Sequence, residues 1–305
     1  MRCLWNKEMM NNLRKRESIE GYLFVAPLLV GLTFFAAFPM IASLAMSFCK
    51  YDIFTPPKFI GGANYQELFR DPLFWQSLKV TCIYSFVSVP LGLTLGLAVV
   101  LLMNQKIKGI AIFRTIYYLP AVVSGVAVAL LWIWIFDPSY GLGNVVLRGL
   151  GLPASQWLSH PRTSLLSLII MSLWGVGGGM VIYLAGLQSV PQHLYEAAEL
   201  DGAGVLMKFR HVTLPMLTPV IFYNLIMGII GSFQVFTQAF VMTSGGPVNS
   251  TLFYVLYLFR NAFNYYRMGY ASAMAWVLFA IILVLTLLVF RSSALWVYYE
   301  GEKRR

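Results

Sequence analysis

The sequence predicts an all-α polytopic membrane protein with six transmembrane helices, on the basis of three observations. Of the 305 residues, 59% are hydrophobic and only 11% are charged, whereas soluble domains carry about 25% charged residues. The charges are clustered and leave six long charge-free windows: 21–49, 80–105, 115–136, 163–195, 211–259 and 268–290. Each window can hold the ~20 apolar residues that a helix needs to cross the hydrocarbon layer.

Within or close to these windows we predict helices at residues 22–48, 79–103, 114–136, 164–188, 217–242 and 271–291. Pro90 and Pro120 can kink the second and third helices. The longest window could hold two spans, but Ser244-Gly245-Gly246-Pro247 predicts a turn inside it. The apolar piece after this turn, residues 251–259, is too short to cross, and its tyrosines predict a segment in the membrane interface.

The distribution of Lys and Arg predicts the orientation. An even number of spans places both termini on one side, and this side carries 14 of the 22 basic residues. The richer side is expected to be cytoplasmic in a prokaryotic cell membrane. The predicted organisation is a cytoplasmic segment at 1–21, a six-helix transmembrane domain at 22–291 and a cytoplasmic tail at 292–305. Topology and anionic lipid account for the net charge of +10, so no nucleic-acid partner is expected.

Catalytic, proton-relay and metal residues are missing from the predicted spans. No Asp, Glu, Lys or Arg lies in the middle of a span, and the nearest, Lys79, Arg114 and Arg291, lie at the ends. Proton-coupled transporters usually keep an ionisable residue at depth, whereas sodium coupling stays open because carbonyls and hydroxyls can ligate sodium. The three cysteines lack metal-ligand spacing. We therefore predict no catalytic site, no bound metal and an external source of energy.

The segment 189–216, between the fourth and fifth spans, is predicted to be a helix-turn-helix outside the membrane. Ser189 and Gln192 form a capping-box pattern, and the first helix is expected to run to about Asp201, with Gly202 as its left-handed cap. A second short helix is expected to stop before Pro215. From periodicity alone, this loop could equally be an amphipathic connector that rests on the membrane surface.

The spacing of residues in this loop carries a family resemblance. Glu196-Ala197-Ala198, then Gly202, then Val212-Thr213-Leu214-Pro215 resembles the E-A-A loop of binding-protein-dependent ABC importer permeases, with Val212 where isoleucine is usual. The resemblance implies the type I importer permease fold, in which this loop is a coupling helix that docks on an ATP-binding subunit. It assigns ATPase coupling to seven residues: Glu196, Ala197, Ala198, Asp201, Gly202, Leu214 and Pro215.

Within the family, the chain is similar to sugar permeases of the maltose, lactose and glycerol-phosphate type. The similarity lies in Leu184–Gln188, Asp201–Gly204 and Thr243–Pro247; the last motif resembles the first of two paired permeases. It implies import of a sugar or oligosaccharide, a homologous second permease, two ATP-binding subunits that hold ATP and Mg, and an extracytoplasmic solute-binding protein. The alternatives are the same machinery for a polyamine or phosphate, a sodium-coupled transporter, or a structural or receptor scaffold.

Polar residues on the apolar fourth and fifth helices suggest a substrate path. Polar groups at membrane depth are costly unless they find partners. They serve either hydrogen bonding between helices or binding of a solute with many hydroxyl groups. The glycine run at 175–179 permits close packing, or it unwinds the helix beside a cavity. The candidates for the path are Trp174, Gly178, Tyr183, Asn224, Ser232, Gln234, Thr237 and Gln238.

Overall fold

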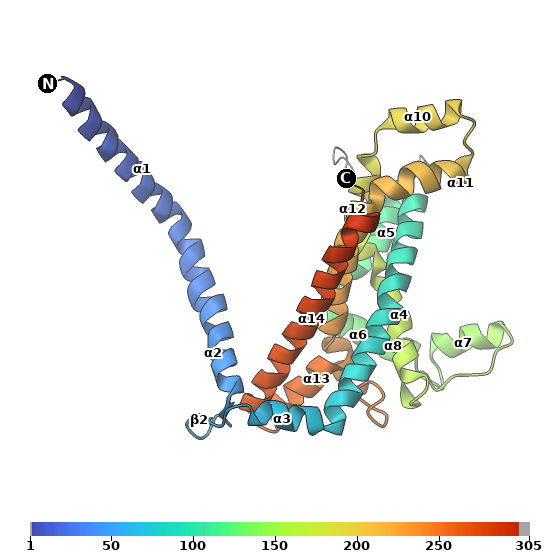
Figure 1. Ribbon diagram of the computed structural model, residues 1–305. Coiled ribbons are helices and arrows are strands. Elements are labelled where there is room, and N and C mark those ends of the chain that lie inside the picture. Colours follow the sequence, from blue (N-terminus) through green and yellow to red (C-terminus); the bar gives the residue numbers. More distant parts are fainter. Residues whose placement is uncertain (1, 106, 299–305) are drawn as a thin grey trace.

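The computed structural model describes residues 2–105 and 107–298, and it is almost entirely helical (Figure 1). Within these ranges five helices are long and apolar enough to cross a membrane, and a bent pair of helices makes up a sixth span. The strands of the described part are one antiparallel pair, β1 (Cys49–Lys50) and β2 (Lys58–Phe59), with Cys49 opposite Phe59. The predicted fold class is confirmed.

The first two spans begin earlier than predicted. The first lies in a long helix made of α1 (Arg2–Leu32), the π-helical turn η1 (Thr33–Ala37) and α2 (Phe38–Ser47), and its candidate span is Lys15–Ser47. The second span, α4 (Pro72–Met103), starts at Pro72 because Asp71 caps it, accepting a hydrogen bond from the Leu73 amide at 2.9 Å. A proline in the first turn loses no hydrogen bond.

The third span is not one helix over 114–136 but two, α5 (Ile110–Val122) and α6 (Gly125–Ile135), bent by 102°. Pro120 cannot donate the hydrogen bond that would continue α5, and Val123 and Ser124 are extended. The fourth span covers the predicted 164–188, as α8 (Ser164–Trp174), the 3₁₀ segment η3 (Gly175–Gly179) and α9 (Met180–Gln188).

The fifth span also differs from a single helix over 217–242. It is continuous with the loop before it, through α11 (Val205–Lys208), the π-helical turn η4 (Phe209–Thr213) and α12 (Leu214–Phe233), then breaks and resumes towards η5 (Ala239–Thr243). The second loop helix therefore does not stop before Pro215. Pro215 lies just after the π-helical turn η4, and a local π adjustment of this kind lets a helix in a membrane carry a proline. The sixth span, α14 (Met268–Trp296), extends the predicted 271–291 at both ends.

The shorter elements gather at the two ends of the bundle. One end, the loop end, holds α10 (Gln192–Leu200) and α11, with the start of α1 and the end of α14 on the same side (Figure 1). The opposite end, the far end, holds the strand pair and five short helical segments: α3 (Ala63–Arg70), α7 (Leu142–Gly149), η2 (Trp157–Ser159), α13 (Tyr254–Phe259) and η6 (Arg260–Asn264).

The α13 segment is part of the core rather than of the membrane interface. Phe253, Tyr254 and Leu256 are fully buried, and the Tyr254 hydroxyl donates to the Met274 carbonyl of α14 at 2.8 Å. The prediction of an interfacial segment at 251–259 is wrong because α13 tucks between α4 and α14 and completes the larger hydrophobic cluster. A second cluster joins α4, α9 and α12 towards the loop end.

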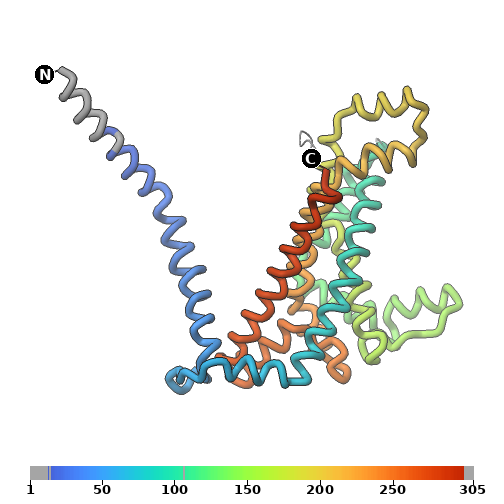
Figure 2. Tube along the Cα trace, in the orientation of Figure 1, coloured from blue at the N-terminus to red at the C-terminus, as the bar shows by residue number. Residues whose placement is uncertain are grey.

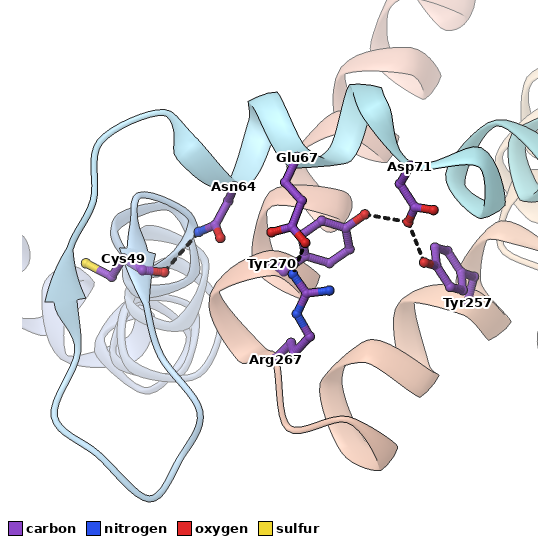
Figure 3. A network of polar contacts seen from close by, with 7 residues as sticks. All are labelled: Cys49, Asn64, Glu67, Asp71, Tyr257, Arg267 and Tyr270. Atoms are coloured by element: carbon purple, nitrogen blue, oxygen red, sulfur yellow. Dashed lines mark hydrogen bonds and ion pairs between the residues drawn. The ribbon is translucent and has the colours of Figure 1, made fainter.

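The first span leans away from the bundle and meets it at the far end, where α2 packs on α14 (Figure 2). Polar contacts fix this junction. Asn64 donates to the Cys49 carbonyl at 2.9 Å, and Asp71 accepts hydrogen bonds from the hydroxyls of Tyr257 and Tyr270 (Figure 3). One ion pair, between Arg267 and Glu67 at 2.5 Å, adds to it. These contacts hold α3 against α13 and α14.

Candidate functional site: a pocket beside broken spans and a projecting loop

Three consecutive spans are interrupted, and the interruptions contact one another. A Cβ added to Gly178 in η3 would lie 3.5 Å from Cβ of Ala121, just before the break in the third span. A Cβ added to Gly125, just after that break, would lie 3.8 Å from the Thr237 methyl group, beyond the break in the fifth span. Irregular backbone inside a membrane is tolerated where it is buried in protein or lines a water-filled cavity, and transporters place binding sites at such breaks.

The glycine run serves both purposes considered for it. A Cβ on Gly177 would lie 1.8 Å from the Tyr117 carbonyl oxygen, so glycine is required for α5 to approach the fourth span. The same run, Gly175–Gly179, forms the 3₁₀ segment. Close packing and local unwinding therefore occur together.

Beside the 3₁₀ segment lies a cavity of about 470 Å³ between α4, the fourth span and α12. This volume suits a small ligand. Its polar groups are hydroxyls and one amide, and none of the described residues that line it is charged. The lining residues are Tyr84, Ser88, Val89, Gly92, Leu93, Gly96, Ser172, Gly175, Val176, Gly179, Tyr183, Asn224, Met227, Gly228, Gly231, Ser232 and Val235.

The polar groups of this pocket retain capacity for further hydrogen bonds. The Asn224 amide nitrogen donates to the Val220 carbonyl at 2.9 Å, and its oxygen points towards Gly179. Ser232 donates to the Ile229 carbonyl at 3.0 Å, and its oxygen can still accept. The Tyr183 hydroxyl is buried and has no partner among the described residues. A buried hydroxyl without a partner costs about 1–3 kcal/mol.

Of the eight predicted path residues, three line the pocket: Tyr183, Asn224 and Ser232. The other five lie elsewhere. Trp174 and Gly178 face the third span, with the Trp174 ring 6.1 Å from that of Trp132. Gln234, Thr237 and Gln238 come after the end of α12, because the helix stops at Phe233. The periodicity argument assumed an unbroken fifth helix, so it could not distinguish the residues that line the pocket from those that lie beyond the break.

The segment 189–216 folds into a hairpin that projects from the bundle, with α10 and α11 as its arms (Figure 1). Gly202, at φ +77°, ends α10, and the amides of Gly202 and Ala203 bond the carbonyls of Glu199 and Ala198. This pair of bonds is a Schellman cap. A 2.6 Å ion pair between Lys208 and Glu199 links the arms. The hairpin is thus a defined helix-turn-helix, as predicted, that projects from the bundle.

The residues assigned to coupling occupy two parts of the hairpin. Glu196, Ala197, Asp201 and Gly202 are exposed on the projecting part, with Ala198 half-buried. Leu214 and Pro215 are half-buried at its base, where α12 begins.

The predicted capping box is wrong. The cap position of α10 is Pro191, and the Ser189 hydroxyl bonds back to the Gly186 carbonyl at 2.9 Å. Ser189 is therefore still the last residue of the turn that ends α9, two residues before the cap position of α10.

Sequence analysis missed an apolar surface at the tip of the hairpin. Leu200 is 90% exposed, Val205 83% and Leu206 78%. Large apolar side chains at such exposure mark a surface that contacts a protein or a membrane. The sequence did contain a signal for this surface. These three apolar residues lie in a loop predicted to be outside the membrane, and the loop has no other apolar segment that could bury them.

Comparison with known proteins identifies the family. Residues 88–297 match the model of the "binding-protein-dependent transport system inner membrane component". The chain belongs to this family. It is 45% identical to the probable ABC transporter permease protein YesP of Bacillus subtilis, over 95% of both chains. It is 36% identical to the trehalose/maltose transport system permease protein MalF of Thermococcus litoralis, over 92% of this chain and 96% of that protein.

A solved structure agrees in fold over nearly the full length. It is a bacterial alginate ABC transporter in complex with an alginate pentasaccharide-bound periplasmic protein, with a TM-score of 0.80 and 25% identity, covering 92% of this chain and 95% of the matched chain. The chain is therefore a multi-pass permease subunit of an ABC importer. Membership in this family, rather than the broken spans, decides against the sodium-coupled transporter.

Proposed function

We propose that this permease forms half of a pore that imports a sugar or oligosaccharide, and that the pocket between α4, the fourth span and α12 is its share of the solute path. The supporting observation is the chemistry of the pocket, where hydroxyl and amide groups surround a cavity of about 470 Å³ without a charge among the described lining residues. A saccharide presents hydroxyls that such groups match, and a site built for hydroxyls rejects solutes that lack them.

The same chemistry argues against the two alternative solutes. A polyamine is a polycation, and its desolvated ammonium groups need carboxylates. A phosphate needs cations or an array of backbone amides. The described residues that line the pocket include neither a carboxylate nor a cation. The relatives add support, since their names refer to trehalose and maltose and to alginate.

Family membership supports the rest of the machinery that we propose. A homologous permease would complete the pore, and two ATP-binding subunits would hold ATP and Mg, so this chain itself performs no hydrolysis. One of these subunits would dock on the hairpin, where Glu196 and Asp201 give an acidic rim and Leu200, Val205 and Leu206 an apolar centre. An apolar centre with a polar rim is the usual anatomy of a protein interface.

The orientation that we propose places the hairpin and both termini in the cytoplasm of a prokaryotic cell and the far end outside. The Lys and Arg bias supports it. At the far end, the solute-binding protein would deliver its ligand to the pocket.

The test uses the complete importer in proteoliposomes with its solute-binding protein. We expect the importer to transport a neutral oligosaccharide, and we expect that spermidine and phosphate do not inhibit this transport. Asn224→Leu should reduce import at least tenfold while the ATPases remain assembled, because it removes the amide and fills the pocket. Tyr223→Leu, at the preceding residue of α12 and outside the pocket, should have little effect. Equal import by both variants would place the solute path elsewhere.

A further inference from the structure

A second cavity, of about 400 Å³, lies between α5 and α9 towards the loop end. We name it the α5–α9 groove. Its walls are mostly apolar side chains of α9, and Arg114 is the one charged residue among the described residues that line it. The other polar lining residues are Thr115, Tyr118 and Gln188. The groove therefore combines an apolar surface with a single positive charge.

The guanidinium group of Arg114 is fixed in position, but its charge is not neutralised. Its Nε and Nη2 atoms donate to the Met103 carbonyl at the end of α4, at 3.1 and 2.8 Å. The ion pairs of the described residues lie elsewhere, so no carboxylate in this part of the chain pairs with Arg114. Arg114 is half-buried, and burial of a charge without a counter-ion is costly. An anion in the groove would offset this cost.

Neighbouring groups can also bind an anion. The guanidinium group keeps further N–H donors beyond the two bonded to Met103. The Tyr118 hydroxyl and the Gln188 amide line the same cavity, and neither bonds another of the described residues. Lys108, exposed on the turn between α4 and α5, adds a second cation nearby in the chain. These donors suit the several oxygens of a phosphate group.

The groove opens on an apolar surface that faces away from the proposed solute path. Ile116 on α5 is 57% exposed and Val181 on α9 is 54% exposed. With 3.6 residues per helical turn, Val181 and Ala185 lie on the face of α9 opposite Tyr183, which lines the pocket proposed for the solute. A half-pore turns its solute path towards its partner, so the opposite face of α9 is expected to meet lipid.

We infer that the α5–α9 groove binds an anionic phospholipid, with the headgroup phosphate on Arg114 and an acyl chain along Val181 and Leu184. Arginine binds phosphate oxygens through paired N–H bonds, and basic pockets between spans on the cytoplasmic side recognise anionic headgroups. A free phosphate ion would match Arg114 but would leave the apolar wall of the groove without a partner. The inference adds a ligand that is not transported, and it rests on the proposed function for the direction in which the groove faces.

The test uses the assembled importer in nanodiscs of phosphatidylcholine that contain a minor share of phosphatidylglycerol. A photo-crosslinking residue at position 181 captures lipid, and mass spectrometry gives the ratio of the two headgroups in the captured lipid. Phosphatidylglycerol should be enriched about fivefold over its share of the bilayer. This enrichment corresponds to the ~1 kcal/mol that one basic side chain contributes near an anionic lipid.

Arg114→Gln should return the headgroup ratio to that of the bilayer, because it removes the charge and keeps a polar side chain. Arg291→Gln is the matched control, since Arg291 is an exposed cation at the loop end of α14 outside the groove. This control should keep the enrichment. No enrichment without either substitution would overturn the inference. Equal loss in both variants would also overturn it, because general surface charge would then explain the result.

A second variant guards against misfolding, because Arg114→Gln also removes the bonds to Met103. Tyr118→Phe keeps these bonds and deletes one hydroxyl, so the enrichment should fall about twofold while the ATPases remain assembled. Unchanged enrichment in both groove variants would overturn the inference. So would loss of enrichment on addition of inorganic phosphate, or capture of the second permease instead of lipid. Lipid capture needs no transport, so its failure is distinct from failure of the import test.

Discussion

Gly177→Ala should separate the third span from the fourth. The new Cβ would start 1.8 Å from the Tyr117 carbonyl oxygen and 2.7 Å from its carbon, whereas ordinary contact begins at 3.4 Å. Both neighbours are backbone atoms, so relief requires α5 to move by about 1.6 Å. Overpacking by a methyl group costs roughly 1–3 kcal/mol in a packed core. We expect the upper part of that range here, because no rotamer change can remove the clash.

The neighbouring glycines supply matched controls. A Cβ at Gly178 would meet Ala121 at an ordinary 3.5 Å, and one at Gly175 would meet nothing within 4 Å. Alanine at these two positions should be neutral or stabilise by ~0.4–1 kcal/mol through the unfolded chain. The assay is the apparent melting temperature of the purified importer, with import measured alongside. If Ala at 177 is no more destabilising than Ala at 178, the packing argument is refuted.

Three other predictions test the hairpin and the far end. Gly202→Asp, at φ +77°, should strain the cap of α10 by about 1 kcal/mol and reduce substrate-stimulated ATP hydrolysis, whereas Gly204→Ala, at φ −69° with open space around it, should not; equal activities would refute the coupling assignment. Asn144→Ala removes a buried side chain that makes four hydrogen bonds. Amide hydrogen exchange in residues 138–157 should therefore be faster, with a loss of ~2–4 kcal/mol in protection free energy. Asp71→Asn, which disturbs two tyrosine hydroxyls, should lower the melting temperature more than Arg267→Met, whose half-exposed ion pair contributes at most ~1 kcal/mol; the reverse order would contradict the description of this junction.

The number and position of the spans could be predicted because a membrane allows few solutions for an apolar chain. The charge-free windows located all six spans. The Asp71-Pro72 pair at the start of the second span is a recognisable helix N-cap in the sequence. The hairpin at 189–216 could be predicted for a different, local reason. A glycine directly after a helical pattern, such as Gly202, indicates a left-handed cap that ends the helix.

The breaks in the spans were harder to predict, because they depend on neighbours rather than on local sequence. Pro120 signals a kink but not its angle of 102°, and the close approach of α5 to the fourth span requires Gly177, which lies about 60 residues away in sequence. Nothing in the residues around Gln234 forbids a helix, and the break there moved three predicted path residues away from the pocket. The burial of α13 was likewise invisible, since a short apolar segment with tyrosines suits a membrane interface as well as a core.

The central claim is that a saccharide passes through the pocket lined by Tyr183, Asn224 and Ser232. The direct measurement is the rate at which a thiol reagent modifies Ser232→Cys in the assembled importer, with and without the transported saccharide on its binding protein. Tyr223→Cys, on the same helix but outside the pocket, is the control. We predict that substrate slows modification at 232 at least fivefold and leaves 223 unchanged. Equal rates at 232 with and without substrate would contradict the claim.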